Sequence, residues 1–230
     1  MRCCRWSPHP LPDHGHRRAV EHTQAKGQEH ENNAAALAVA GAYLSHGIEH
    51  ILFGFDHLLF VLGLILIVRN TRMLLLTVTG FTVAHSITLS LATLGVIHVP
   101  GPPVEACIAL SILLLASEIL RRQRGEPSLT ATWPWAVAFT FGLLHGLGFA
   151  SALIDIGLPQ GDIPIALLAF NIGVEVGQLA FIAAVLGVMQ LAKQFRIPKI
   201  VESRLRTVTA YGVGVVAAFW FVERLAGFWA

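Results

Sequence analysis

Long apolar blocks separated by short polar connections make up the chain from about residue 34 onwards. Each block is close to the roughly 20 residues that a helix needs to cross a bilayer. The blocks are continuously apolar rather than alternating with period 2, which argues against transmembrane strands. We therefore expect an all-α bundle of about six membrane-spanning helices, with one more or one fewer allowed. The expected spans cover residues 48–68, 73–97, 104–120, 134–156, 163–191 and 208–229.

The N-terminal segment has a different character. Residues 1–33 are polar and rich in His, Pro and charge, and they lack the apolar core of a signal peptide. This pattern predicts a mobile polar tail before a transmembrane domain over residues 34–230. Residues 34–45 are too short to span alone, so they extend the first span or lie at the interface. The tail holds five histidines that either gather metal outside or have no function, namely His9, His14, His16, His22 and His30.

Composition supports the membrane assignment. Hydrophobic residues make up 54% of the chain and charged residues only 13%, with a mean hydropathy of +0.64. A soluble domain has about 25% charged residues. The net charge is +2, and no basic cluster alternates with aromatic residues, so nothing indicates nucleic-acid binding. Three cysteines are too few for a disulfide framework.

The basic residues predict the orientation. Alternate connections hold ten of the sixteen Lys and Arg residues, and the other two connections hold none. The positive-inside rule makes the basic connections cytoplasmic, so both termini face outward. The ten residues are Arg69 and Arg72, then Arg121, Arg122 and Arg124, then Lys193, Arg196, Lys199, Arg204 and Arg206.

The first span carries the densest polar chemistry, in the motif H-x5-D-H. On a continuous helix His46, His50 and His57 fall within about 40° of one another, and Glu49 and Asp56 lie on the adjoining flank. His46 and His50 would sit near the outer mouth, and His57 deeper. A carboxylate next to a His is either a ligand or a group that orients the imidazole. The alternative is an interfacial hydrogen-bond cluster without metal.

Three later spans each bury an ionisable residue, which costs roughly 2.5–3.5 kcal/mol in the bilayer centre and indicates an interior with partners. His85 lies mid-span in F-T-V-A-H-S-I-T-L, and His145 lies among glycines in F-G-L-L-H-G-L-G-F-A. Glu175 shares a helix face with Asn171 and Gln178. The alternative is that a lone His in such a helix only bridges to a neighbouring residue and binds no metal. We expect four helices to bring their ionisable groups to similar depths, namely His57, His85, His145 and Glu175.

The third span holds Ser111 and Glu118 seven residues apart and hence on one face. Glu118 either completes a path toward the cytoplasm or forms an interfacial ion pair with the arginines that follow it. The predicted metal ligands are His50, Asp56, His57, His85, His145 and Glu175. The residues expected along the path or behind the ligands are His46, Glu49, Ser111, Glu118, Asn171 and Gln178.

Mixed imidazole and carboxylate donors suit nickel, cobalt, zinc, iron or copper better than magnesium or calcium. No set of thiolates favours copper(I). Gly142 with Gly146, and Gly173 with Gly177, stand four apart, a spacing that lets helix backbones approach closely in lipid.

The four motifs, in order over roughly residues 44–185, resemble the HupE/UreJ family. That family comprises bacterial membrane proteins associated with hydrogenase and urease gene clusters and regarded as nickel permeases, with some members linked to cobalt. The resemblance implies that the H-x5-D-H residues and His145 serve metal passage across a bacterial inner membrane. Some members carry His-Gly-x-x-His-Gly-x-Glu, whereas this chain has Leu143-Leu144-His145-Gly146. It lacks the first His and looks closer to a second branch, which leaves the metal open.

Three functions fit these residues. The first is a permease for a divalent transition metal, most simply nickel; no nucleotide-binding loop is present, so the chain shows no ATP engine of its own. The second is an intramembrane metalloenzyme whose metal activates water. The third is a metal-binding sensor or accessory protein. The expected partners are membrane lipid and the metal ion. A second copy of the chain and proteins of metalloenzyme maturation are further candidates.

Overall fold

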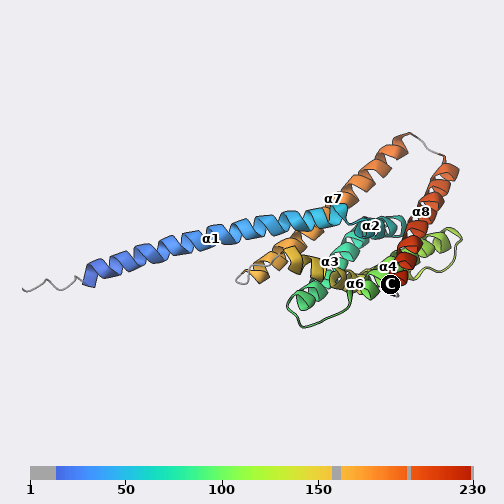
Figure 1. The fold of residues 1–230 in the computed structure, drawn as a ribbon. Helices are drawn as coiled ribbons and strands as arrows, with labels where there is room; N and C mark the ends of the chain where they lie inside the picture. The colour runs from blue at the N-terminus through green and yellow to red at the C-terminus, as the bar shows by residue number, and fades with distance from the viewer. Residues whose placement is uncertain (1–13, 157–161, 196–197, 229–230) are drawn as a thin grey trace, which may run out of the picture.

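The computed structural model describes residues 14–156, 162–195 and 198–228, and these residues form helices without any strand (Figure 1). The all-α prediction is therefore confirmed for the described part of the chain. Residues 1–13, with His9, lie outside it. The helices are α1 (His14–Phe53), α2 (Phe55–Ile67), α3 (Thr71–Thr93), α4 (Gly101–Gln123), α5 (Leu129–Thr132), α6 (Pro134–Ile156), α7 (Ile163–Gln194) and α8 (Lys199–Ala226).

Five segments of these helices are long and apolar enough to cross a membrane. Two apolar helices are shorter, α2 and the Pro134–Ala150 part of α6. Five of the predicted spans each correspond to one helix, namely α3, α4, α6, α7 and α8. The chain is thus built as a multi-pass bundle, whereas the number of crossings and the orientation of the termini stay predictions. The five long segments are Lys26–Phe53, Thr71–Thr93, Gly101–Gln123, Ile163–Gln194 and Ile200–Ala226.

The first predicted span is not one helix, and its prediction over residues 48–68 is wrong. The helix breaks at Gly54, whose ψ of 88° lies outside the helical region. A Cβ at Gly54 would stand only 2.5 Å from the carbonyl oxygen of His50, so this conformation suits glycine. Asp56 then lies in the first turn of α2, where a carboxylate is favoured by the helix dipole. The Gly-x-Asp sequence was a helix-start signal inside an apolar run.

The described part of the polar N-terminal segment is helical. The long helix α1 begins at His14 and runs through the predicted boundary at residue 33 without a break (Figure 1). Residues 34–45 are part of this same helix, so they extend the first apolar segment outward, as one of the two sequence interpretations expected.

Close backbone contacts join α1 to α7. A Cβ added to Gly47 would collide with the Phe170 carbonyl group, and one added to Gly173 would collide with the carbonyl oxygen of Leu44. A Cβ on Gly177 would lie 3.2 Å from the Cβ of Ile51. Small residues let two backbones approach closely in lipid, where dispersion between packed helices replaces the hydrophobic effect.

The same device joins α3 to α6. A Cβ on Gly142 would lie 2.5 Å from the Phe81 carbonyl oxygen, and one on Gly146 would collide with the carbonyl oxygen of His85. The predicted role of both glycine pairs is therefore confirmed. It has a consequence for function, because the contact at Gly146 draws α6 against the turn of α3 that carries His85.

Two buried apolar clusters fill the bundle. One joins α2, α3, α4 and α8 around Phe60, Phe81 and Ile112, and the other joins α1, α6 and α7 around Ile51 and Phe170. Both clusters consist of apolar side chains, so a polar group that lies between them needs hydrogen-bond partners from within the bundle.

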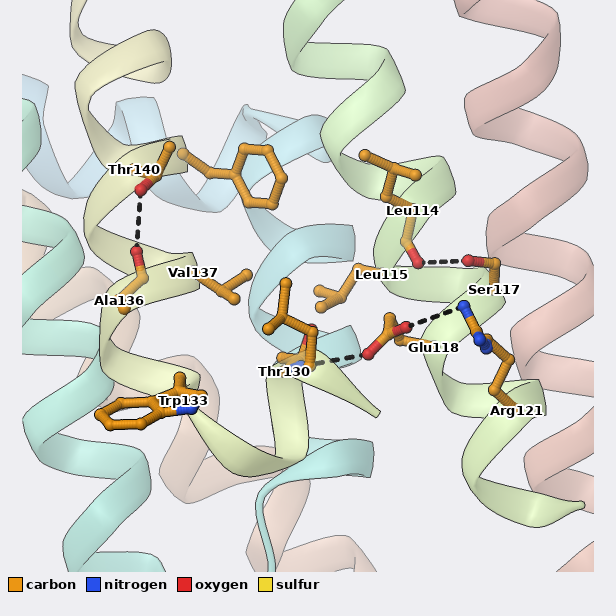
Figure 2. A pocket seen from close by; sticks show the side chains of 12 residues that line it. Leu114, Leu115, Ser117, Glu118, Arg121, Thr130, Trp133, Ala136, Val137 and Thr140 are labelled. Atoms are coloured by element: carbon orange, nitrogen blue, oxygen red, sulfur yellow. Dashed lines mark hydrogen bonds and ion pairs between the residues drawn. The ribbon is translucent and has the colours of Figure 1, made fainter. Parts of the chain in front are cut away.

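Glu118, near the end of α4, holds the segment that follows this helix through hydrogen bonds and an ion pair (Figure 2). Its Oε2 accepts hydrogen bonds from Ser128 Oγ at 2.7 Å and Thr130 N at 3.1 Å, and its Oε1 lies 3.9 Å from Arg121 Nη1. These contacts fix α5 beside a mainly apolar pocket of about 430 Å³. Both oxygens of Glu118 are therefore engaged in holding the chain.

Candidate metal centre

Four imidazoles from four helices meet between the two apolar clusters. His50 comes from α1, His57 from α2, His85 from α3 and His145 from α6. The ring centroid of His57 lies 4.6 Å from that of His50, 4.8 Å from that of His145 and 5.9 Å from that of His85. The rings of His57, His85 and His145 are at most 3% exposed. The sequence-predicted histidines of three separate motifs are thus brought together.

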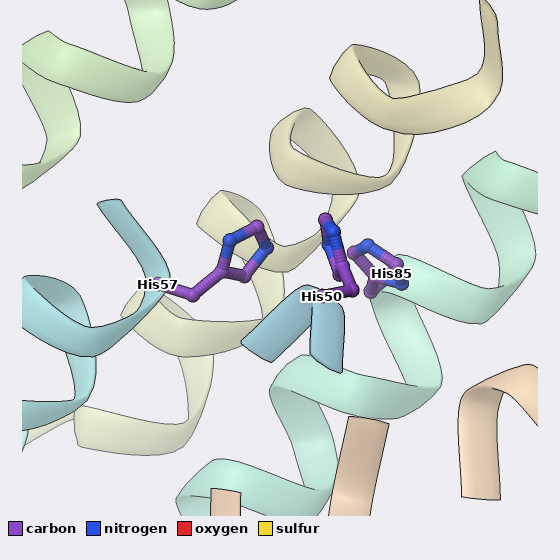
Figure 3. A group of neighbouring side chains, drawn as sticks. All are labelled: His50, His57 and His85. Atoms are coloured by element: carbon purple, nitrogen blue, oxygen red, sulfur yellow. The ribbon is translucent and has the colours of Figure 1, made fainter. Parts of the chain in front are cut away.

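The break at Gly54 makes this meeting possible. Seven residues of continuous helix would separate His50 and His57 by about 10.5 Å along the axis. With the break, the ring centroids of His50 and His57 lie 4.6 Å apart, and the depths predicted for the two residues in the membrane stay predictions. The two motif histidines face the same space from the two sides of the break, as Figure 3 shows together with His85.

Asp56 orients the ring of His57. Its Oδ1 lies 3.0 Å from His57 Nδ1 and also accepts the backbone N–H of His57 at 2.9 Å. A carboxylate oxygen in this position only accepts, so Nδ1 of His57 carries the proton and Nε2 carries the lone pair. Of the two roles that the sequence left open for Asp56, the geometry fits that of a group behind the ligand.

Asn171 plays the same part for His85. Its Nδ2 donates to the Leu167 carbonyl oxygen at 2.7 Å, so its Oδ1 is the atom that faces His85 Nδ1, at 3.4 Å. His85 then donates from Nδ1 and leaves Nε2 with the lone pair. The link between α3 and α7 thus fixes the ring of His85.

Ser111 orients the fourth imidazole. Its hydroxyl donates to the Ile108 carbonyl oxygen at 2.7 Å and lies 3.3 Å from His145 Nε2. Because the single hydroxyl proton is used on Ile108, Ser111 accepts from Nε2–H of His145. The lone pair of His145 is therefore on Nδ1. Ser111 acts from behind a ring, two helical turns away from its predicted companion Glu118.

Each of the four rings keeps one buried nitrogen without a partner in the described part of the protein: His50 Nε2, His57 Nε2, His85 Nε2 and His145 Nδ1. For three of them it is the nitrogen that the hydrogen bonds leave unprotonated. A buried acceptor without a partner costs about 1–3 kcal/mol. Three such acceptors, beside the Nε2 of His50, favour a ligand that accepts lone pairs, and a metal ion is such a ligand.

The spacing fits a metal ion. The candidate ligand nitrogens of His50, His57 and His85 all lie within 4.8 Å of one another. Nitrogens bound at about 2.0–2.1 Å around one tetrahedral ion stand about 3.3 Å apart. Each ring would therefore move inward by less than about 1 Å to bind. His145 adjoins His57 outside this group of three, where it would serve as a fourth or a successive ligand.

Aromatic rings wall the cluster. Phe149 and Phe170 lie 3.8 Å and 5.5 Å from the ring centroid of His50, and Phe60 and Phe81 lie 5.4 Å and 5.1 Å from that of His145. The sequence interpretation did not include these aromatic residues, although the spacing of three of them from the histidines indicated a shared helix face. Phe60 follows His57 by three residues, Phe81 precedes His85 by four and Phe149 follows His145 by four, spacings that share a helix face.

Glu175 and Gln178 form a second polar station beside the cluster. Thr79 Oγ1 donates to Glu175 Oε1 at 2.7 Å, and Thr82 Oγ1 donates to Gln178 Oε1 at 2.9 Å. Within the described residues, Glu175 Oε2 and Gln178 Nε2 are buried without partners. Glu175 shares the α3–α7 interface with the Asn171–His85 link, but it does not lie in the group of close imidazoles.

His46 and Glu49 lie apart from the cluster. Their side chains are 44% and 61% exposed and form a pair with 3.5 Å between His46 Nδ1 and Glu49 Oε2. They occupy the same helix as His50 but are open to the surroundings. The structure therefore offers them as surface groups near the site.

Comparison with known proteins gives one match. A family described as HupE / UreJ protein matches residues 25–224, which is most of the chain and includes the three histidine motifs and the Glu175 motif. Neither the curated proteins nor the solved structures include a match to this chain.

Proposed function

Because this chain belongs to the HupE/UreJ family, a nickel/cobalt transporter-like family, we propose that it is a membrane permease for a divalent transition metal, most simply nickel. The ion passes through the cluster of His50, His57, His85 and His145. The observation that carries this proposal is that four imidazole rings lie close together and each has one buried nitrogen without a partner in the described part of the chain.

The donor set favours a transition metal over a hard cation. Calcium and magnesium prefer cages of oxygen, whereas imidazole suits nickel, cobalt, copper and zinc. Asp56 is hydrogen-bonded through Oδ1 to His57, so it supplies negative charge next to the ion while it fixes the ring. A carboxylate that accepts a hydrogen bond from a metal-binding imidazole raises the basicity of that imidazole and fixes its tautomer.

A route toward the cluster opens between α3 and α7. A pocket of about 350 Å³ lies between the end of α3 and the start of α7, and its lining includes Ser86, Ser90 and Asn171. Asn171 is the residue that bonds His85, so the pocket ends one side chain from a proposed ligand. The predicted orientation makes this the outward side.

The route continues on the other side of His85. Thr82 with Gln178, and Thr79 with Glu175, line the same α3–α7 interface on the predicted cytoplasmic side of His85. Transport requires binding that favours entrance without preventing exit. A carboxylate with a free oxygen, placed beyond the imidazoles, gives the departing ion its next ligand. Glu118, with one oxygen engaged at the start of α5 and the other at Arg121, takes no part in this route.

The test is uptake of radioactive nickel, with cobalt as competitor, by cells that express the chain, His57→Ala or His46→Ala. We expect saturable uptake that His57→Ala abolishes and His46→Ala leaves within about twofold, because His46 is an exposed imidazole on the same helix. Loss of a ligand costs more than the 10–100-fold that is typical of groups behind it.

Binding to the purified protein separates this proposal from the alternatives. Stoichiometric nickel binding that depends on His57, without uptake above the empty vector, would reject the permease and favour a metalloenzyme or a sensor. Equal loss of uptake in the His46 and His57 variants would place the route away from the cluster.

A further inference from the structure

Two arginines from distant segments act on the charge of a third, Arg122, at the end of the bundle opposite the α3–α7 pocket. Arg122 lies in the last turn of α4, and the charged groups that act on it are Arg69, between α2 and α3, and Arg206, on α8. A hydrogen bond of 2.6 Å from Thr207 Oγ1 to Gln123 Oε1 joins α8 to α4 at this place. The neighbours of this bonded pair are Arg206 and Arg122.

The arginine group carries more positive charge than its carboxylates neutralise. Arg206 pairs with Glu202 at 3.0 Å. Arg69 and Arg122 form no ion pair within the part of the chain that the structure describes. Arg121, one residue away, differs because Glu118 and Glu126 both lie within 4.0 Å of it. The nearby carboxylates of Glu118 and Glu126 therefore pair with Arg121. Within the described residues, the guanidinium groups of Arg69 and Arg122 pair with none.

An apolar groove adjoins this charge. A pocket of about 310 Å³ lies between α2, α7 and α8, with Leu62, Leu66, Val185, Met189 and Leu205 in its wall. Lys193, Glu202 and Arg206 lie at its polar edge. Figure 1 shows the last turns of α7 and the first turns of α8 standing clear of the other helices above α2. Arg206 belongs to both features, so the charge and the groove form one surface.

The lining of the groove limits its occupant. The groove between α2, α7 and α8 is lined mainly by apolar side chains, so it suits an apolar occupant. A flexible hydrocarbon chain can follow such a space. The occupant must also present negative charge at its end, because guanidinium groups bind phosphate through bidentate hydrogen bonds.

We propose that this surface binds one anionic phospholipid, with its phosphate between Arg69, Arg122 and Arg206 and an acyl chain in the groove between α2, α7 and α8. Basic pockets between membrane helices on the cytoplasmic side are known to hold lipid headgroups, and the predicted orientation places the arginines on that side. The site is separate from the imidazole cluster, so the proposal does not depend on metal transport.

The experiment uses the full chain purified in detergent and titrated with phosphatidylglycerol or phosphatidylcholine of the same acyl chains. Native mass spectrometry counts the bound lipid, and the rise in Tm measures its binding. We expect one phosphatidylglycerol per chain, bound at least about tenfold more tightly than phosphatidylcholine. Arg69→Gln/Arg122→Gln reduces that affinity by about 30-fold, the effect of two basic residues at an anionic surface. Arg69→Lys/Arg122→Lys keeps the charge but not the bidentate hydrogen bonds, so it loses less affinity than the Gln variant, and the Tm of both variants without added lipid checks that they fold.

Two matched variants make the assignment specific. Arg124→Gln removes an exposed charge two residues from Arg122 and leaves the affinity unchanged, whereas an equal loss would show that only the overall surface charge matters and would overturn the site. Leu205→Trp fills the groove without changing its charge. This variant should weaken the binding of the lipid but not the binding of inorganic phosphate. Inorganic phosphate that displaces the lipid completely at similar concentrations would overturn the role of the groove.

Discussion

The imidazole cluster and Glu118 both place polar side chains inside apolar helices, but they differ in what those side chains lack. Both oxygens of Glu118 have partners at the start of α5 and at Arg121. Within the described residues, each imidazole of the cluster has one nitrogen without a partner, and three have the other nitrogen held by a hydrogen bond. Buried polar groups are normally satisfied, so this difference distinguishes the structural carboxylate of Glu118 from the imidazoles of the proposed metal site.

The strongest test of this comparison replaces a ligand by an apolar residue of similar size. His145→Leu should lower nickel affinity by more than about 100-fold, beyond the loss typical of groups behind a ligand. The thermal stability of the metal-free protein should stay the same or rise, because an unsatisfied buried nitrogen is removed and Ser111 keeps its bond to Ile108. Isothermal titration and thermal unfolding in detergent measure the two effects. A large fall in metal-free stability would make His145 a structural residue.

The second test concerns the break that brings His50 to His57. Gly54→Ala should reduce nickel affinity by about 10–100-fold, comparable to losing a group that orients a ligand. The added Cβ would lie 2.5 Å from the His50 carbonyl oxygen and 3.2 Å from His57 Nδ1, so both rings must shift. Gly41→Ala is the matched control on the same helix.

No atom lies within 4 Å of a Cβ at Gly41, and alanine there should stabilise α1 by up to about 1 kcal/mol without changing nickel binding. Equal nickel affinities for the Gly54 and Gly41 variants would mean that the break at Gly54 has no role in the site.

The break also marks the limit of the sequence argument. The periodicity predicted that His46, His50 and His57 share a face, which holds only on an unbroken helix. The helix-start signal at Gly54 and Asp56 was present, but hydrophobicity on both sides hid it. The predicted glycine contacts succeeded because they depend on local spacing alone.

The partners of the imidazoles depend on tertiary contacts and could only be named as candidates. Ser111 and Asn171 were expected near the path, and the structure puts each against one imidazole. Glu118 and Ser111 were grouped because they share a face of α4, yet two helical turns separate a residue at the cluster from one at α5. Depth along a helix therefore distinguished their roles where the face did not.

A third test asks whether Asp56 is a ligand or a group behind one. Asp56→Asn keeps an acceptor toward His57 Nδ1 but removes the charge, so nickel affinity should fall by about tenfold, the lower end of the range for such groups. The maximal nickel stoichiometry should not change. Glu49→Gln, which alters an exposed carboxylate on α1, is the control and should bind as the unaltered chain does. A loss as large as that of His145→Leu would instead make Asp56 a direct ligand.

The smallest effect on metal handling is expected at Glu118, and that result would complete the comparison. Glu118→Gln weakens the hydrogen bonds to Ser128 and Thr130 and the contact with Arg121, so the free energy of unfolding should fall by about 1–3 kcal/mol. Nickel uptake per folded molecule should stay within about twofold, because this carboxylate has no oxygen to offer an ion. Uptake normalised to the folded protein, measured by fluorescence-detected gel filtration, checks this. A specific loss of uptake in a fully folded variant would show that a satisfied carboxylate also lies on the route, and partner satisfaction would then fail as a guide to which buried polar groups carry function.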